Sequence, residues 1–130
     1  MKVKKLAWLV PAIALLLIGS LAVAQTAQAA RVQIGLTGSA GFPDANGKAR
    51  FEDRGGEQRF RVEVEDASVP CAQLQVVVNG TPFGTMSGPL GNCSLALNSD
   101  LGQTVPAVTA GSQIMVNETQ LGLLVVSGAF

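Results

Sequence analysis

The reactive side chains of this chain centre on two cysteines, Cys71 and Cys93, and the chain has no histidine. Without histidine, it cannot assemble a Ser-His-Asp or Cys-His catalytic arrangement, or a histidine metal site. The two cysteines are also too far apart in sequence for the Cys-x-x-Cys spacing that is typical of redox pairs. We therefore predict a structural disulfide between them, as expected for a chain that folds in an oxidising compartment. A redox or metal-binding pair is the alternative.

Carboxylates are the second group that could do chemistry, either as paired acids for glycoside hydrolysis or as calcium ligands. Most of those in the central region alternate with apolar residues or fall in turns, where solvated charges are normally found: Glu52, Asp53, Glu57, Glu63, Glu65 and Asp66. Asp44 and Asn46 have the spacing that begins a calcium loop, but Lys48 occupies the next ligand position and no spaced glutamate follows. We therefore expect no enzyme, no metal and no cofactor, with a carboxylate- or calcium-dependent domain as an alternative.

The first 30 residues have the layout of a secretory signal peptide. Three lysines within the first five residues precede an apolar run over 6–18 and an alanine-rich end. Ala27 and Ala29 form a small-x-small cleavage site. We therefore expect residues 1–29 to be a signal peptide helix that is removed, and residues 30–130 to be one domain.

Two alternatives to this cleavage remain open. Ala22-Val23-Ala24 is a second candidate cleavage site. An uncleaved membrane anchor is the other alternative, because the apolar stretch from Leu6 to Ala24 is long enough to span a bilayer. Gly19, Ser20 and the alanine-rich end favour cleavage.

Export places the mature protein in the periplasm or outside the cell. Loss of the three N-terminal lysines leaves 9 − 3 = 6 basic residues against 9 acidic ones, a net charge of about −3. A mildly acidic domain lacks the electrostatic footprint of a nucleic-acid-binding protein, and the basic residues form no long run of one sign. We therefore expect no nucleic-acid partner and no stable membrane insertion after cleavage.

These residues must be positioned by β-strands, because apolar residues recur at every second position. In the segment 59–66, Phe60, Val62 and Val64 alternate with charged residues, which is typical of a strand with one buried face. The same alternation occurs in further short segments: 32–36, 74–78, 95–97 and 114–116. The sequence predicts an all-β fold, a single antiparallel β-sandwich of seven to eight short strands with an immunoglobulin-like or related Greek-key topology. Residues 99–112 would be its crossing connection.

One hairpin is expected around a two-residue turn at Gly55-Gly56. This turn pairs Phe51 with Phe60 on the inner face and Glu52 with Arg59 on the outer face. A slip of one residue would place inner residues opposite outer ones, so the register is well specified.

A second hairpin is expected around Asn79-Gly80, a strong type I′ turn signal. It pairs Val76 with Phe83 and Val77 with Pro82. Because proline cannot donate a hydrogen bond to a strand on its other side, the strand from Pro82 to about Met86 should lie at a sheet edge or be unpaired at that point.

The last hairpin, over 113–130, is apolar on both faces. Met115, Leu124 and Val126 are predicted to share one of these faces. One interpretation is a strand pair covered on both sides by its own domain, or an alternation that is blurred by a bulge. The other is a surface for a partner. On the second interpretation, Met115, Leu124 and Val126 form the candidate partner surface.

Several segments carry a resemblance to a known class of proteins. They are "GKARFED", "RFRVEVED", "LQVVVNGTPFGT", "LALNSDLGQTVPAV" and "SGAF". Over residues 35–130 the chain resembles small secreted bacterial β-sandwich proteins of unknown function. The resemblance implies an immunoglobulin-like or related sandwich and brings no catalytic residues.

Together these observations predict an exported, non-enzymatic β-sandwich module that is binding or structural in the cell envelope or the extracellular space. Its partner would be an unknown protein or another envelope component, and its oligomeric state stays open. The main alternative is a subunit of an envelope assembly that pairs through a strand edge.

Overall fold

The structure is a computed structural model that describes residues 30–130. The predicted signal peptide, with its cleavage residues Ala27 and Ala29, lies outside the described residues. No helix in the described part of the chain is long and apolar enough to cross a membrane.

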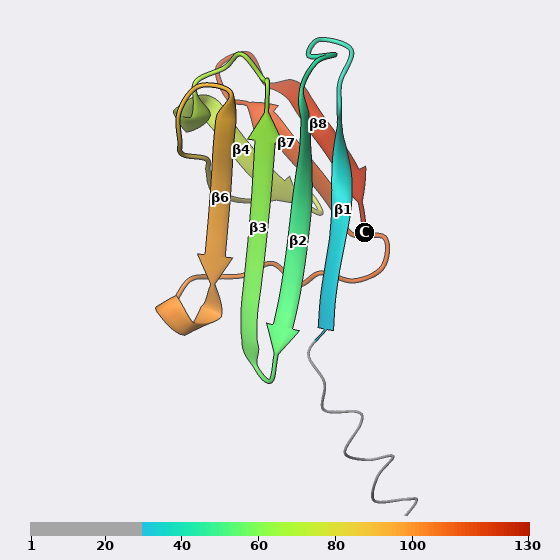
Figure 1. Ribbon diagram of the computed structural model, residues 1–130, viewed down its shortest axis with the longest axis vertical. Coiled ribbons are helices and arrows are strands. Elements are labelled where there is room, and N and C mark those ends of the chain that lie inside the picture. The colour runs from blue at the N-terminus through green and yellow to red at the C-terminus, as the bar shows by residue number, and fades with distance from the viewer. Residues whose placement is uncertain (1–29) are drawn as a thin grey trace, which may run out of the picture.

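The described chain consists of eight antiparallel β-strands and two single-turn 3-10 helices (Figure 1). The strands are β1 (Ala30–Gly38), β2 (Asn46–Arg54), β3 (Glu57–Glu65), β4 (Leu74–Val78), β5 (Thr81–Thr85), β6 (Asn92–Asn98), β7 (Gln113–Glu118) and β8 (Leu123–Ala129). The 3-10 helices are η1 (Cys71–Gln73) and η2 (Ser99–Leu101). The strand order is β5-β4-β7-β8-β1-β2-β3-β6.

This single sheet folds over into two facing halves. We call β1, β2, β3 and β6 the front half, and β4, β5, β7 and β8 the back half; Figure 1 shows the front strands lying before β4, β7 and β8. The halves join at two residue pairs between β1 and β8, Thr37–Ser127 and Gly38–Val126. A bridge between Ser87 and Ser94 nearly closes the other side.

The predicted all-β antiparallel fold is therefore confirmed, with eight strands. The difference from the expected pair of separate sheets is that hydrogen bonds between β1 and β8 connect the halves into one sheet. The predicted crossing over 99–112 is also observed, because it leads from β6 in the front half to β7 in the back half. Its Val105 and Val108 pack against the core.

The core lies between the two halves and is built from the alternate residues that the sequence pattern marked as inner. Those that are almost completely buried are Ala49, Phe60, Val62 and Val64 from the front half, with Leu74, Val76, Ile114 and Val116 from the back half. Because inner and outer residues alternate, the strand residues next to these eight core positions point away from the core.

The β2–β3 hairpin has the predicted register, with Phe51 opposite Phe60 and Glu52 opposite Arg59. Gly55 and Gly56 form its turn with φ of 59° and 101°. Positive φ at both central positions is the requirement of a type I′ turn, and glycine meets it without steric cost.

The β4–β5 hairpin is confirmed in part. Its turn lies at Asn79 and Gly80, and Val77 pairs with Pro82 as predicted. The predicted partner of Val76 is wrong, because Val76 pairs with Gly84 and the register shifts at this point. A β-bulge takes up the extra residue. β5 lies at one end of the strand order, as the proline indicated.

The β7–β8 hairpin corrects the predicted partner surface. Val116 pairs with Val126 while Asn117 pairs with Leu124, so a bulge leaves Val125 without a partner of its own. The bulge breaks the two-residue alternation, and both Val125 and Val126 are completely buried in the core. Val126 is therefore not a surface residue.

The predicted disulfide is present between Cys71 and Cys93, whose Cα atoms are 5.3 Å apart. Cys71 lies in η1, directly before β4, and Cys93 lies in β6. The bridge therefore ties the back half to the front half at the end of the strands.

Candidate functional site

The basic residues of the described chain gather on one surface, the outer face of the front half. All six occupy outward-pointing positions of β1, β2 and β3: Arg31, Lys48, Arg50, Arg54, Arg59 and Arg61. Four carboxylates share these strands and this side: Glu52, Glu57, Glu63 and Glu65. We call this set the arginine face.

Charge is strongly segregated between this face and the rest of residues 30–130. The arginine face carries 6 − 4 = +2 charges. The remaining residues carry five carboxylates and no basic group: Asp44, Asp53, Asp66, Asp100 and Glu118. A chain segment with a net charge of about −3 thus presents a positive face. No run of basic residues in the sequence marks this face, because its six basic residues are spread over three strands.

Three arginines converge on one carboxylate at the β1–β2 side of this face. Glu52 is only 7% exposed. Its carboxylate lies 3.5 Å from Nε of Arg31, 3.5 Å from Nε of Arg50 and 3.3 Å from Nη2 of Arg54. One negative charge therefore faces three positive ones, which leaves a local surplus of positive charge.

The arginines of β3 are paired along their own strand. Nε of Arg59 donates to Glu57 at 2.7 Å, and Nε of Arg61 donates to Glu63 at 2.8 Å. Nδ2 of Asn98 also donates to Glu57, at 3.3 Å. The hydrogen bond from Arg59 is the main cause that lowers the pKa of Glu57 below its ordinary value of 4.5, and the same bond raises the pKa of Arg59.

Arg50 and Arg61 lie directly opposite each other on β2 and β3. Like charges in this position repel each other and destabilise a sheet. Glu52 and Glu63 lie on the diagonals and offset part of this repulsion, but Glu52 is shared with two further arginines. The pair marks the region of the face where an added anion would be most favourable.

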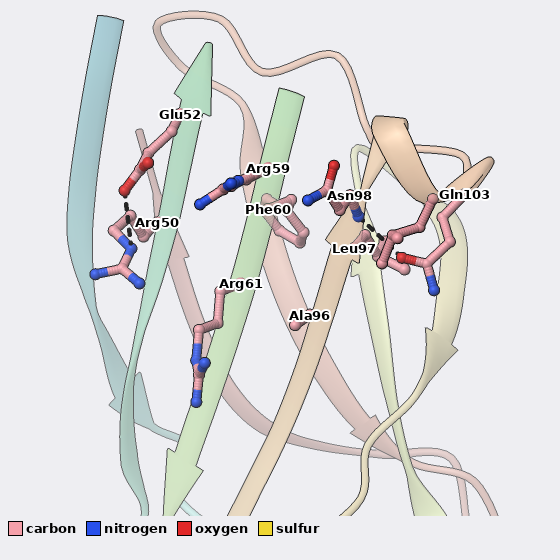
Figure 2. A pocket seen from close by; sticks show the side chains of 10 residues that line it. Arg50, Glu52, Arg59, Phe60, Arg61, Ala96, Leu97, Asn98 and Gln103 are labelled. Carbon is pink, nitrogen blue, oxygen red and sulfur yellow. Dashed lines mark hydrogen bonds and ion pairs between the residues drawn. The ribbon is translucent and has the colours of Figure 1, made fainter. Parts of the chain in front are cut away.

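A shallow groove of about 280 Å³ crosses this region. Arg50, Arg59 and Arg61 line it together with Glu52, as Figure 2 shows. Figure 2 also shows the side chain of Arg59 extending from β3 toward β2, while that of Arg61 runs alongside β3.

The other wall of the groove comes from the turn after β6. Oδ1 of Asn98 accepts a hydrogen bond from the backbone N–H of Asp100 at 2.9 Å. The backbone N–H of Asn98 donates to Oε1 of Gln103, also at 2.9 Å. These bonds fix the segment that contains η2, and Leu101 at its end is 73% exposed. The groove therefore combines guanidinium groups, two side-chain amides and one exposed leucine.

The sites that the sequence predicted lie elsewhere. Met115 is half-buried and Leu124 is 36% exposed, and both belong to the back half. Near the suggested calcium loop, Nδ2 of Asn46 donates to the backbone oxygen of Asp44 at 3.5 Å. Within residues 30–130 no group of three or more acidic or cysteine residues is placed to hold a metal ion.

The groove was missed because its two walls come from distant segments, β2–β3 and residues 98–103. One signal was present in the sequence. The register of the β2–β3 hairpin already placed Arg50 opposite Arg61, and such a repulsive pair indicates a surface that gains from an anion.

Comparison of the chain with protein-family models, with curated proteins and with solved structures finds no match.

Proposed function

We propose that this chain is an exported, non-enzymatic binding module of the cell envelope or its surroundings. It engages its partner through the arginine face. We also propose that its fold groups it with the small secreted immunoglobulin-like β-sandwich proteins of bacteria that its sequence resembles. One observation carries the proposal: all six basic side chains within residues 30–130 lie on one face of an acidic domain.

Segregated charge favours binding because it orients the domain. A positive face on a negative body turns toward an anionic partner and disfavours contact through any other side. Arginine suits such contacts, since its planar guanidinium group presents several donors in a fixed arrangement. The disulfide between Cys71 and Cys93 supports export, because such bonds persist in oxidising compartments.

The test is retention on the cell envelope. The full chain is expressed in cells that naturally make it, and the exported protein is isolated and its N-terminus determined, which we expect to be Ala30. Its retention on washed envelope is then measured at low and high salt. Neutralising Arg50→Gln with Arg61→Gln should release the protein, and added salt should do the same to the wild type.

The matched control is Thr81→Glu with Gln113→Glu, two exposed positions of the back half. It changes net charge by the same −2 without touching the arginine face, so retention should persist. Equal release of both variants would show that only net charge matters and would contradict a specific face. Retention of the arginine variant would contradict the proposal directly.

A second candidate, an assembly subunit that pairs through strand edges, is favoured by the seam between β5 and β6. Away from the Ser87–Ser94 bridge these two strands have no ladder between them in the described sheet. Against this, Pro82 interrupts the donors of β5. Mass measured over a range of concentrations decides the matter, because an edge-pairing subunit must grow in size with concentration.

A further inference from the structure

We propose that the groove on the arginine face binds an extended acidic peptide segment of a partner protein. Two carboxylates spaced two residues apart bind Arg59 and Arg61, and a neighbouring apolar side chain packs on Leu101. This inference rests on the proposed function and names the class of ligand that the same face takes.

The two arginines retain donors for a ligand. Each guanidinium group has five N–H donors. The hydrogen bonds that Arg59 and Arg61 donate within residues 30–130 both come from Nε, to Glu57 and Glu63. The terminal nitrogens of both groups make no hydrogen bond within these residues and stay available to a ligand. Their fork geometry matches a carboxylate. Roughly half of each side chain is exposed, at 49% and 47%.

The spacing of the two arginines fits an extended chain. Arg59 and Arg61 are alternate residues of one strand, so their Cα atoms lie about 7 Å apart. An extended peptide repeats its side chains on one side at the same interval. A segment of the form acid-x-acid that runs along β3 therefore places each carboxylate over one guanidinium group.

The groove and the carboxylates beside it favour a peptide over a dense polyanion. Glu52, Glu57 and Glu63 lie among the arginines and would repel a polymer that carries charge on every unit. Leu101 offers an apolar contact, and Gln103 offers an amide to a peptide backbone. A peptide with spaced carboxylates and flanking apolar residues fits the carboxylates among the arginines, the apolar contact at Leu101 and the amide of Gln103.

The experiment titrates the oxidised exported protein with an acetylated and amidated peptide, Leu-Glu-Ser-Glu-Leu, by calorimetry at low salt. The peptide Leu-Gln-Ser-Gln-Leu is the ligand control, and inorganic polyphosphate of matched charge is the competing class. We expect binding of the acidic peptide, no measurable binding of the amide peptide, and weaker binding of polyphosphate. Raising the salt concentration to about 0.5 M should strongly weaken the binding of the acidic peptide.

Variants locate the contact. Arg59→Gln with Arg61→Gln should weaken the binding of the acidic peptide about tenfold or more. Thr81→Glu with Gln113→Glu should keep the affinity for this peptide within about twofold of the wild type. Leu101→Ser should weaken binding several-fold, since it removes only the apolar contact. Glu57→Gln should strengthen binding, because it frees Nε of Arg59. Unchanged melting curves show that each variant is folded.

Three results would overturn the inference: equal binding of the amide peptide, tighter binding of polyphosphate, or no effect of Arg59→Gln with Arg61→Gln. Failure here is distinguishable from failure of the proposed function. If no peptide binds but envelope retention still requires Arg50 and Arg61, only the ligand class is wrong. If retention is also independent of these arginines, the binding face itself is wrong.

Discussion

The two halves of the sheet share one core but have opposite outer surfaces. The outer face of the front half is a network of arginines and glutamates. Across the back half, a row of uncharged residues occupies the equivalent positions: Pro82, Val77, Met115 and Ser127. Val77 in this row is only 8% exposed although it points outward.

The back half has one charged residue on its strands, Glu118, and that residue serves a turn. It is buried, and its carboxylate accepts hydrogen bonds from the amides of Gln120 and Leu121 at 2.6 and 3.0 Å. Because both halves pack against the same core through their inner residues, their outer faces are free to differ. Only the front half uses this freedom to gather charge.

Substitutions at two neighbouring residues of β3 should change the free energy of unfolding by very different amounts, because one lies in the core and the other on the arginine face. Phe60→Ala should lower the free energy of unfolding by about 4 kcal/mol, because it leaves a cavity between the halves. Arg61→Ala, one residue further along β3, should cost less than about 1 kcal/mol, since exposed ion pairs contribute little. Chemical denaturation of both variants measures the difference. Equal losses would contradict the alternation on which both surfaces depend.

Removal of the disulfide should have the next largest effect, because it links the two halves. Cys71→Ser with Cys93→Ser opens a loop with a sequence separation of 22 residues. The chain-entropy relation gives a loss of about 3.4 kcal/mol, which corresponds to roughly 15–25 °C in melting temperature. Thermal unfolding with and without reductant measures it. Free thiols in the protein isolated from the exported fraction would contradict the bridge.

A third prediction compares how much substitutions on each of the two outer faces weaken retention on the envelope. Met115→Glu with Leu124→Glu alters the surface that the sequence alone suggested. It should leave envelope retention within about twofold. Arg50→Gln with Arg61→Gln should weaken retention about tenfold, which is about 1.4 kcal/mol. The reverse order, measured side by side at one salt concentration, would move the binding surface to the back half.

The smallest effect is a pH dependence that belongs to the arginine face. The pKa of Glu57 is lowered in the folded state by the hydrogen bond from Arg59. A lowered carboxyl pKa stabilises the fold at pH values above the ordinary value of 4.5, and this contribution is lost as the pH falls through the folded-state pKa. Glu57→Gln should therefore lose less stability than the wild type between pH 5 and about pH 3. Identical acid unfolding of the two proteins would contradict the pairing.

The alternation of residues in β3 was sufficient to predict its buried face and its register with β2, since each apolar residue there has a charged neighbour. The position of Pro82 likewise predicted an edge strand. A bulge in the last hairpin was one interpretation of its two apolar faces, but the local pattern did not give the position of either bulge. The burial of both Val125 and Val126 depends on where β8 meets β7 and β1, and this is a tertiary constraint.

The groove on the arginine face was also not predictable from the sequence, because it too depends on tertiary contacts. Its arginines could be assigned to an outer face from the hairpin register, but the wall at Asn98, Leu101 and Gln103 comes from the crossing segment. The folding of that segment depends on side-chain caps such as Asn98 to Asp100, which no two-residue or helical period reveals.

Amide chemical shifts of the oxidised protein, recorded by NMR during titration with the acidic peptide, locate the bound peptide on the sheet. We predict shifts confined to β2, β3, β6 and residues 98–103, which disappear in the Arg59→Gln, Arg61→Gln variant. Shifts centred on β4, β7 and β8 instead would contradict this prediction.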